Sequence, residues 1–163
     1  MNSESKATTF SSITLLLLKE LRLERNIHQA QIADFCGKTP SAWTKIETGR
    51  SPLSMEIFFR VCNGMQVLPS TVLSAMERYA ALLGQNGWAV VSKELENEDH
   101  LLAEAQEYYG SPGFRARLNF AFTSVLNGPT YNPNGMVEPS PVFLFALSQD
   151  FKNTQLTPTA FTF

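Results

Sequence analysis

Residues 28–49, HQAQIADFCGKTPSAWTKIETG, constrain the fold more than any other stretch, because they predict two short helices joined by a tight turn. The apolar residues of the first part lie on one helical face and are Ile32, Ala33, Phe35 and Cys36. Gly37 follows them directly. Glycine readily adopts the left-handed backbone found at the C-termini of helices, so we expect the first helix to end there.

The second helix of this stretch begins with Thr39 and Pro40. The threonine hydroxyl can cap the helix N-terminus, and proline suits the first turn, where no backbone donor is needed. Trp43 and Ile46 lie three residues apart and predict a buried stripe. The residues left on the outer face are polar and are Ser41, Thr44 and Lys45. A short helix with such an outer face fits the major groove of DNA.

These residues resemble the lambda-repressor/Cro-like helix-turn-helix family, and the resemblance extends over about residues 14–84. The segment LLLLKELRLERN is similar to the opening helix of that family. Gln29 with residues 32–33 matches its Gln…Leu-Ala signature, and residues 46–49, IETG, match its Ile-Glu-Asn-Gly ending. Pro52 and the amphipathic MEIFFRVCNGMQV match its fourth helix. The chain departs from the family pattern at three positions, which are His28, Trp43 and Thr48.

The resemblance implies a five-helix DNA-binding domain and assigns contacts with DNA. The residues at base-reading positions are Thr39, Pro40, Ser41, Thr44 and Lys45. The residues expected at DNA phosphates are Gln29, Lys38, Thr48 and Arg50. Two base-reading positions hold shorter side chains than the amides common there, so DNA shape should contribute to specificity. The family also implies that Gln29 caps its helix and that Glu47 pairs inside the domain, with Arg22 or Arg25 as partner.

Composition is that of a globular protein, with 163 residues of which 44% are hydrophobic. The longest apolar run, residues 15–18, is far too short to cross a membrane. The N-terminus, MNSESKATTF, lacks the basic start and apolar core of a signal peptide, so we expect a soluble cytoplasmic protein. Both cysteines, Cys36 and Cys62, fall on apolar helix faces, where we expect buried free thiols.

Charge divides the chain into two parts. Residues 1–85 hold nine basic and seven acidic side chains, whereas residues 86–163 hold four basic and eight acidic ones. This change of sign, together with the Gly-Gln-Asn-Gly sequence at 84–87, predicts a domain boundary. We therefore expect a flexible N-terminus at 1–11, a DNA-binding domain at 12–84, and an α+β dimerisation or sensing domain at 85–163.

The second part shows a different pattern from the first. We expect strands at 88–92 and 141–149, a helix at 97–109 capped by Asn97, a turn-rich loop at 127–141, and a tail or edge strand at 157–163. Residues 114–122 alternate between apolar and other residues and favour a third strand, although a helix capped by Ser111 with Pro112 in its first turn competes with it. On that strand Arg115 and Arg117 would share a face, where they bind an anionic ligand or an acidic partner or are simply solvated.

Catalytic and metal-binding motifs do not emerge from the sequence. His28 and His100 are isolated, and no nucleophile with a base, phosphate loop or Cys-His cluster appears, so we expect neither an enzyme nor a cofactor or metal. The favoured function is a bacterial or phage transcription regulator that binds double-stranded DNA as a homodimer on a palindromic operator. Two alternatives are an antitoxin with autoregulatory DNA binding and a protein-interaction module that no longer binds DNA. A protein partner or small ligand could act on residues 85–163.

Overall fold

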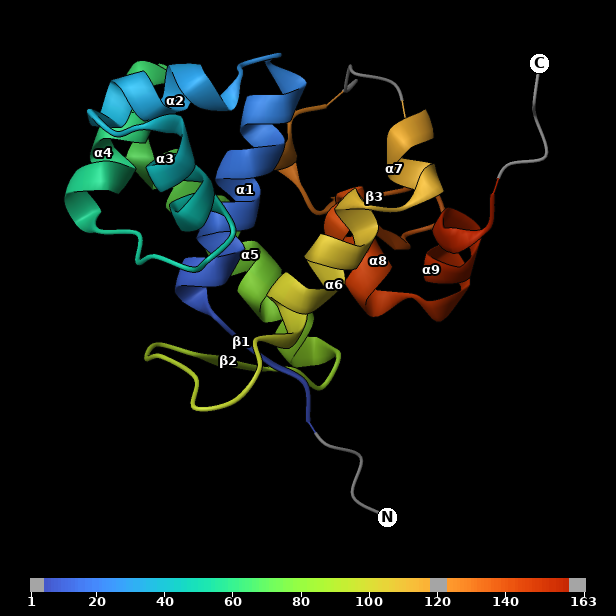
Figure 1. The fold of residues 1–163 in the computed structure, drawn as a ribbon. Helices are drawn as coiled ribbons and strands as arrows, with labels where there is room; N and C mark the ends of the chain where they lie inside the picture. Colours follow the sequence, from blue (N-terminus) through green and yellow to red (C-terminus); the bar gives the residue numbers. More distant parts are fainter. Residues whose placement is uncertain (1–4, 118–122, 159–163) are drawn as a thin grey trace.

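The computed structural model describes residues 5–117 and 123–158 (Figure 1). Its first part contains β1 (Ala7–Thr9), α1 (Phe10–Glu24), α2 (Gln29–Cys36), α3 (Pro40–Glu47), α4 (Met55–Gly64) and α5 (Pro69–Gln85). The second part contains β2 (Ala89–Val91), α6 (His100–Tyr109), α7 (Pro112–Ala116), the 3-10 turn η1 (Val125–Asn127), β3 (Thr130–Tyr131), β4 (Val137–Glu138), α8 (Pro141–Leu147) and α9 (Gln149–Leu156). The expected fold class, a mainly α protein with five helices followed by a small α+β part, is confirmed.

Helix α1 lies at the centre of the molecule. Figure 1 shows α2, α3 and α4 on one side of it and α6 to α9 on the other. The helix begins at Phe10, where the Thr9 hydroxyl caps it by accepting a hydrogen bond from the Ser12 N–H at 3.0 Å. Residues 12–18 of α1 are all buried. A helix that is buried all round needs covering elements on every side, and the two parts of the chain supply them together.

The helix signals predicted from residues 28–49 are confirmed. Gly37 has a φ of 64° at the C-terminus of α2. The Thr39 hydroxyl accepts from the Ala42 N–H at 3.1 Å, and Pro40 is the first residue of α3. The Ser54 hydroxyl likewise accepts from the Ile57 N–H at 3.1 Å and starts α4. Local capping chemistry therefore sets where these helices begin and end.

The N-terminal segment differs from the expected flexible tail at 1–11. Ala7–Thr9 form β1, which pairs in parallel with β2, the strand expected at 88–92. Thr8 is fully buried, and its hydroxyl donates to Asp99 at 2.9 Å. The Ala7 N–H donates to the His100 imidazole at 3.0 Å. These partners come from the distant α6 region, which is why the polar sequence alone did not reveal the strand.

Two segments of the second part that were expected to be strands are helices in the structure. Residues 141–149 were expected to be a strand, but Pro141–Leu147 form α8 with proline in the first turn. A short, uniformly apolar run fits a buried strand and a buried helix equally well. Pro112–Ala116 form α7, capped by the Ser111 hydroxyl, so the competing helix is correct for this segment. The rest of the expected strand, 118–122, and the end of the expected tail, 159–163, lie outside the described residues.

The helix expected at 97–109 is confirmed, with a later start. Asp99 rather than Asn97 caps α6, since its carboxylate accepts from the Leu102 N–H at 3.1 Å. Its buried face includes Leu101, Ala105 and Tyr108.

One hydrophobic cluster draws residues from both parts of the chain. On α5, Tyr79 stacks on Phe143 of α8 with ring centroids 4.0 Å apart. The Tyr79 hydroxyl also accepts from the Ser140 N–H at 2.8 Å. The expected boundary at 84–87 is where α5 ends, and the elements on either side of it pack on this shared core. No helix within the described ranges is long and apolar enough to cross a membrane.

Candidate nucleic-acid interface

Helix α3 presents a polar outer face above a firmly held inner face. Trp43, Ile46 and Glu47 are buried, with exposed fractions of 2–3%. On the opposite side Ser41, Lys45 and the adjoining residues are exposed to solvent, and Thr44 is half-buried. The remaining exposed residues expected at DNA are Lys38, Thr39, Pro40, Thr48 and Arg50, and Gln29 is half-buried. The structure therefore brings the nine expected residues to α3 and its immediate surroundings.

Glu47 fixes the inner side of α3. Its carboxylate accepts from Arg22 Nε at 2.7 Å, and Arg22 Nη1 donates to the Ile27 carbonyl at 3.1 Å. The predicted pairing of Glu47 with a helix-one arginine is thus confirmed for Arg22. Gln29 also donates its amide to Glu47, so one carboxylate ties α3 to α1 and α2. Buried charges held by several hydrogen bonds restrict a helix to one orientation.

Gln29 differs from its expected capping role. The N–H at the start of α2, on His28, donates to the side-chain oxygen of Gln31 at 2.8 Å. Gln29 instead turns toward α3 through its bond to Glu47. Its carbonyl oxygen cannot donate to a phosphate, so only the second amide hydrogen is available for that contact.

The threonine hydroxyls on the outer face have their protons engaged by the helix itself. Thr44 donates to the Pro40 carbonyl at 2.9 Å, and Thr48 donates to the Thr44 carbonyl at 2.8 Å. A hydroxyl whose proton is used in this way can still accept a hydrogen bond but cannot donate one. Thr44 can therefore accept from an amino group of adenine or cytosine in the major groove.

Lys45 and Arg50 are exposed cations at the C-terminal end of α3, where the Arg50 N–H donates to the Lys45 carbonyl at 2.8 Å. Neither has an ion-pair partner among residues 5–117 and 123–158. A lysine at a base-reading position can donate to the guanine acceptors N7 and O6. An exposed arginine just beyond the helix suits a phosphate oxygen. The electrostatic character of the site comes from these side chains and from Lys38.

Gly49, just after α3, packs against the second part of the chain. Its φ is +82°, and a Cβ built there would lie 2.5 Å from Leu102 Cδ1. Leu102 belongs to α6, so the α6 side chain occupies the space that any other residue would need. Leu102 was missed as a site residue because the contact links segments far apart in sequence. The half-buried apolar face of the helix predicted at 97–109 was the available signal.

Arg115 and Arg117 lie at the C-terminal end of α7 rather than on a strand. Arg115 donates to the Gly110 carbonyl at 3.2 Å. Arg117 donates to both carboxylate oxygens of Glu20, at 3.1 and 3.2 Å, and to the Tyr108 hydroxyl at 3.1 Å. Although burial alone would lower it, the pKa of Arg117 is raised because the Glu20 carboxylate lies beside it. The Arg117 guanidinium thus already has an anionic partner inside the protein.

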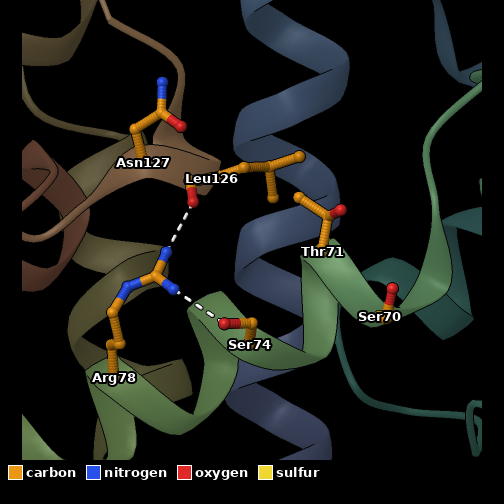
Figure 2. Close-up of a pocket in the computed structure, with 6 residues that line it drawn as sticks. All are labelled: Ser70, Thr71, Ser74, Arg78, Leu126 and Asn127. Atoms are coloured by element: carbon orange, nitrogen blue, oxygen red, sulfur yellow. Dashed lines mark hydrogen bonds between the residues drawn. The ribbon is translucent and has the colours of Figure 1, made fainter.

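A polar hollow of about 530 Å³ lies between α5 and η1 (Figure 2). Its lining residues are Ser70, Thr71, Ser74, Arg78, Leu126 and Asn127. Arg78 donates to the carbonyl oxygens of Leu126 at 2.6 Å and Gly128 at 3.1 Å, and to the Ser74 hydroxyl at 2.9 Å. The two bonds to carbonyl oxygens link Arg78 of α5 to η1 and to the residue that follows it.

The described residues contain no group of three or more His, Cys, Asp or Glu side chains placed to hold a metal ion. Cys36 and Cys62 are buried free thiols, as predicted. Burial raises the pKa of the Cys62 thiol to about 11. A thiol of this kind is a packing residue, because reactivity requires an accessible thiolate.

Comparison with known families confirms the resemblance. Residues 16–75 match the model of a family described as a helix-turn-helix domain. This match covers α2, α3 and α4 together with most of α1 and part of α5. No curated protein and no solved structure matches the chain. Residues 16–75 are therefore a helix-turn-helix domain, the kind of unit that places its second helix in the major groove of DNA.

Proposed function

We propose that this protein is a sequence-specific transcription regulator of bacterial or phage origin that binds double-stranded DNA through α3. One observation carries the proposal. The outer face of α3 carries an exposed cation, Lys45, while Glu47 and Arg22 hold the inner face in place. A preorganised helix loses little conformational entropy when it enters the groove, so its side chains can contribute to affinity and specificity.

Base reading centres on three residues. Lys45 donates to guanine, Thr44 accepts from an exposed amino group, and Ser41 makes a single hydrogen bond. Thr39 and Pro40 lie at the N-terminus of α3, where they contact a thymine methyl group. The Thr39 hydroxyl oxygen accepts from the Ala42 N–H in the helix cap, and its methyl group is the part that packs on the thymine methyl.

Phosphate contacts surround the reading face. Arg50 and Lys38 are the exposed cations, and Gln29 and Thr48 are the polar residues that complete this set. Such contacts fix the position of the protein on the duplex without reading its sequence. The set is small, so tight binding requires two copies, whose α3 helices would enter successive major grooves about 34–36 Å apart. The operator would then be palindromic, and its occupancy in the cytoplasm would control transcription.

Selection of DNA fragments with the purified full-length chain, at a stated salt concentration, tests the proposal. Enrichment of fragments that share a motif is the expected result. On the enriched motif, Lys45→Ala should relax the preference at particular base pairs, at a cost of about 1–3 kcal/mol for the preferred base. Arg50→Ala should weaken all sequences alike and reduce the slope of log affinity against log salt by about 0.9.

Lys93→Ala provides a matched control, since Lys93 is also an exposed lysine but lies in the loop after β2. It should change neither the base preference nor the salt slope. If no motif is enriched, or if the Lys45 and Arg50 variants behave like Lys93→Ala, the proposed interface is wrong.

A further inference from the structure

Helix α4 carries an exposed apolar pair on the surface of the helix-turn-helix domain. Met55 is 62% exposed and Phe59 is 48% exposed. The two residues are four apart, so their side chains are neighbours on the same face of the helix. Scattered exposed apolar residues are common, but a long thioether beside an aromatic ring on one helix is a typical composition for a contact surface.

A charged pair lies alongside the apolar pair. Glu56 and Arg60 have side-chain exposed fractions of 73% and 50%, and they form an ion pair with each other at 3.0 Å. Each follows one member of the apolar pair directly in the sequence. The α4 face, defined as Met55, Glu56, Phe59 and Arg60, therefore consists of one apolar and one charged stripe that run parallel along the helix.

This face is complementary to itself when two copies meet antiparallel. Consider a two-fold axis that runs between the two copies, perpendicular to α4 and at the level of residue 58. It places Glu56 of one copy opposite Arg60 of the other, and the reverse. At a rise of about 1.5 Å per residue, Phe59 then lies only about 3 Å along the axis from both Phe59 and Met55 of the second copy. The same operation keeps the apolar stripes together and the charged stripes together.

We propose that the α4 face is the surface through which a second copy of this chain docks when two copies bind one operator. The inference rests on the proposed DNA-binding function. The position of α4 supports it, because α4 lies at the edge of the helix-turn-helix domain, away from α6 to α9 (Figure 1). Docking there joins the two DNA-binding domains directly and leaves the second part of each chain outside the contact.

The size of the α4 face determines when pairing occurs. Four side chains per copy bury far less than the roughly 1,200 Å² typical of a stable interface, so the copies remain largely monomeric at low concentration. Two copies held on adjacent half-sites have a high effective concentration, which makes a small contact effective. Pairing therefore appears as cooperativity on DNA. Removal of the Phe59 ring, which the contact would bury, should reduce affinity for a two-half-site operator by about tenfold or more.

The decisive experiment separates contact between chains from the ion pair within α4. Glu56→Arg produces a face with two positive charges, and Arg60→Glu produces a face with two negative charges. Each variant alone should bind a two-half-site DNA without cooperativity, because like charges then oppose each other across the axis. An equimolar mixture should regain cooperativity, although neither chain has regained its internal ion pair.

Phe59→Ser should abolish cooperativity without weakening binding to a single half-site. Glu107→Arg is the control, because it reverses the charge of an exposed acidic residue on α6, outside the α4 face. Thermal unfolding of every variant establishes that it is folded. Binding to a single half-site is measured in parallel and reports the proposed DNA-binding function by itself. If the unmodified chain does not bind a single half-site, the DNA-binding function is rejected. If it binds but the mixture of charge variants does not regain cooperativity, only the α4 contact is rejected.

Sedimentation of the same proteins without DNA, at near-millimolar concentration, gives an independent readout. The mixture of the two charge variants should associate more strongly than either variant alone. The α4 contact is overturned if the mixture fails to associate and to restore cooperativity, or if Phe59→Ser retains full cooperativity.

Discussion

The ion pair between Glu20 and Arg117 provides a test of whether the two parts of the chain unfold as one unit. Glu20 lies on α1 with a side chain that is only 4% exposed, and Arg117 follows α7 with a side chain that is 25% exposed. The Glu20 carboxylate also accepts from the Tyr109 hydroxyl at 3.0 Å and from the Ser140 hydroxyl at 3.3 Å. Elements from α6, α7 and the start of α8 thus converge on one carboxylate of α1.

The expected loss in the free energy of unfolding depends on which buried groups each substitution leaves without a partner. Arg117→Met leaves Glu20 charged and buried, which typically costs about 3–5 kcal/mol, and the partial exposure of Arg117 places the loss near about 3 kcal/mol. Glu20→Gln keeps an acceptor oxygen for one of the two hydroxyls and leaves the cation able to reach water, so a loss of about 1–2 kcal/mol is expected. In the double variant no buried charge remains, and the total loss should stay near about 2 kcal/mol. The coupling energy is therefore about 2–3 kcal/mol.

Urea unfolding measured by circular dichroism and by tryptophan fluorescence gives these values. Trp43 reports on α3 and Trp88 on the start of the second part, and both are buried. Single-tryptophan variants should show the same midpoint for both probes, since the two parts share one core. Effects that add to within about 0.5 kcal/mol would show that Glu20 and Arg117 are not coupled. Separate midpoints for Trp43 and Trp88 would refute the single unfolding unit.

Three further outcomes follow from the structure. Arg22→Ala should reduce the free energy of unfolding by about 3–5 kcal/mol, because Glu47 loses its buried cation; urea titration measures it, with an exposed-arginine substitution as control. Gly49→Ala should cost about 1–3 kcal/mol, and adding Leu102→Ala should recover only the part due to steric contact, since the positive φ remains. Burial raises the pKa of Tyr79 from 10.0 to about 12, so the unfolded chain ionises first and stability falls as the pH rises through this range. The loss reaches about 2 kcal/mol at pH 12, and Tyr79→Phe should make the slope of unfolding free energy against pH less steep above pH 10.

The helix-turn-helix domain was predictable because its signals are local. Gly37 and Thr39 each act within one helical turn, and the structure confirms both. The partner of Glu47 was predictable from the family resemblance, although the choice between Arg22 and Arg25 needed the packing of α1. The second hydrogen bond of Glu47, from Gln29, required knowledge of how α2 and α3 cross.

The second part was harder to predict because its elements are defined by distant contacts. Val142, Phe143, Phe145 and Ala146 of α8 are all buried, so neither a two-residue nor a helical period is visible in the sequence. What selects the helix is Pro141 at its first position and the fit of Phe143 against Tyr79 of α5. The same dependence on distant residues hides β1, whose partners are β2 and the start of α6.

The composition of α1 explains why the two parts belong together. Its run of four leucines covers more than one face of a helix, and residues 12–18 are all buried. A helix with a single covered face would leave part of that run in water, at a cost of about 1.5–3 kcal/mol for each leucine. The second part removes this cost, and Glu20, Glu24 and Asp99 supply hydrogen bonds at the contact. Helix α6 therefore forms part of the wall of the helix-turn-helix domain, and Leu102 of α6 fills the space beside Gly49 at the end of α3.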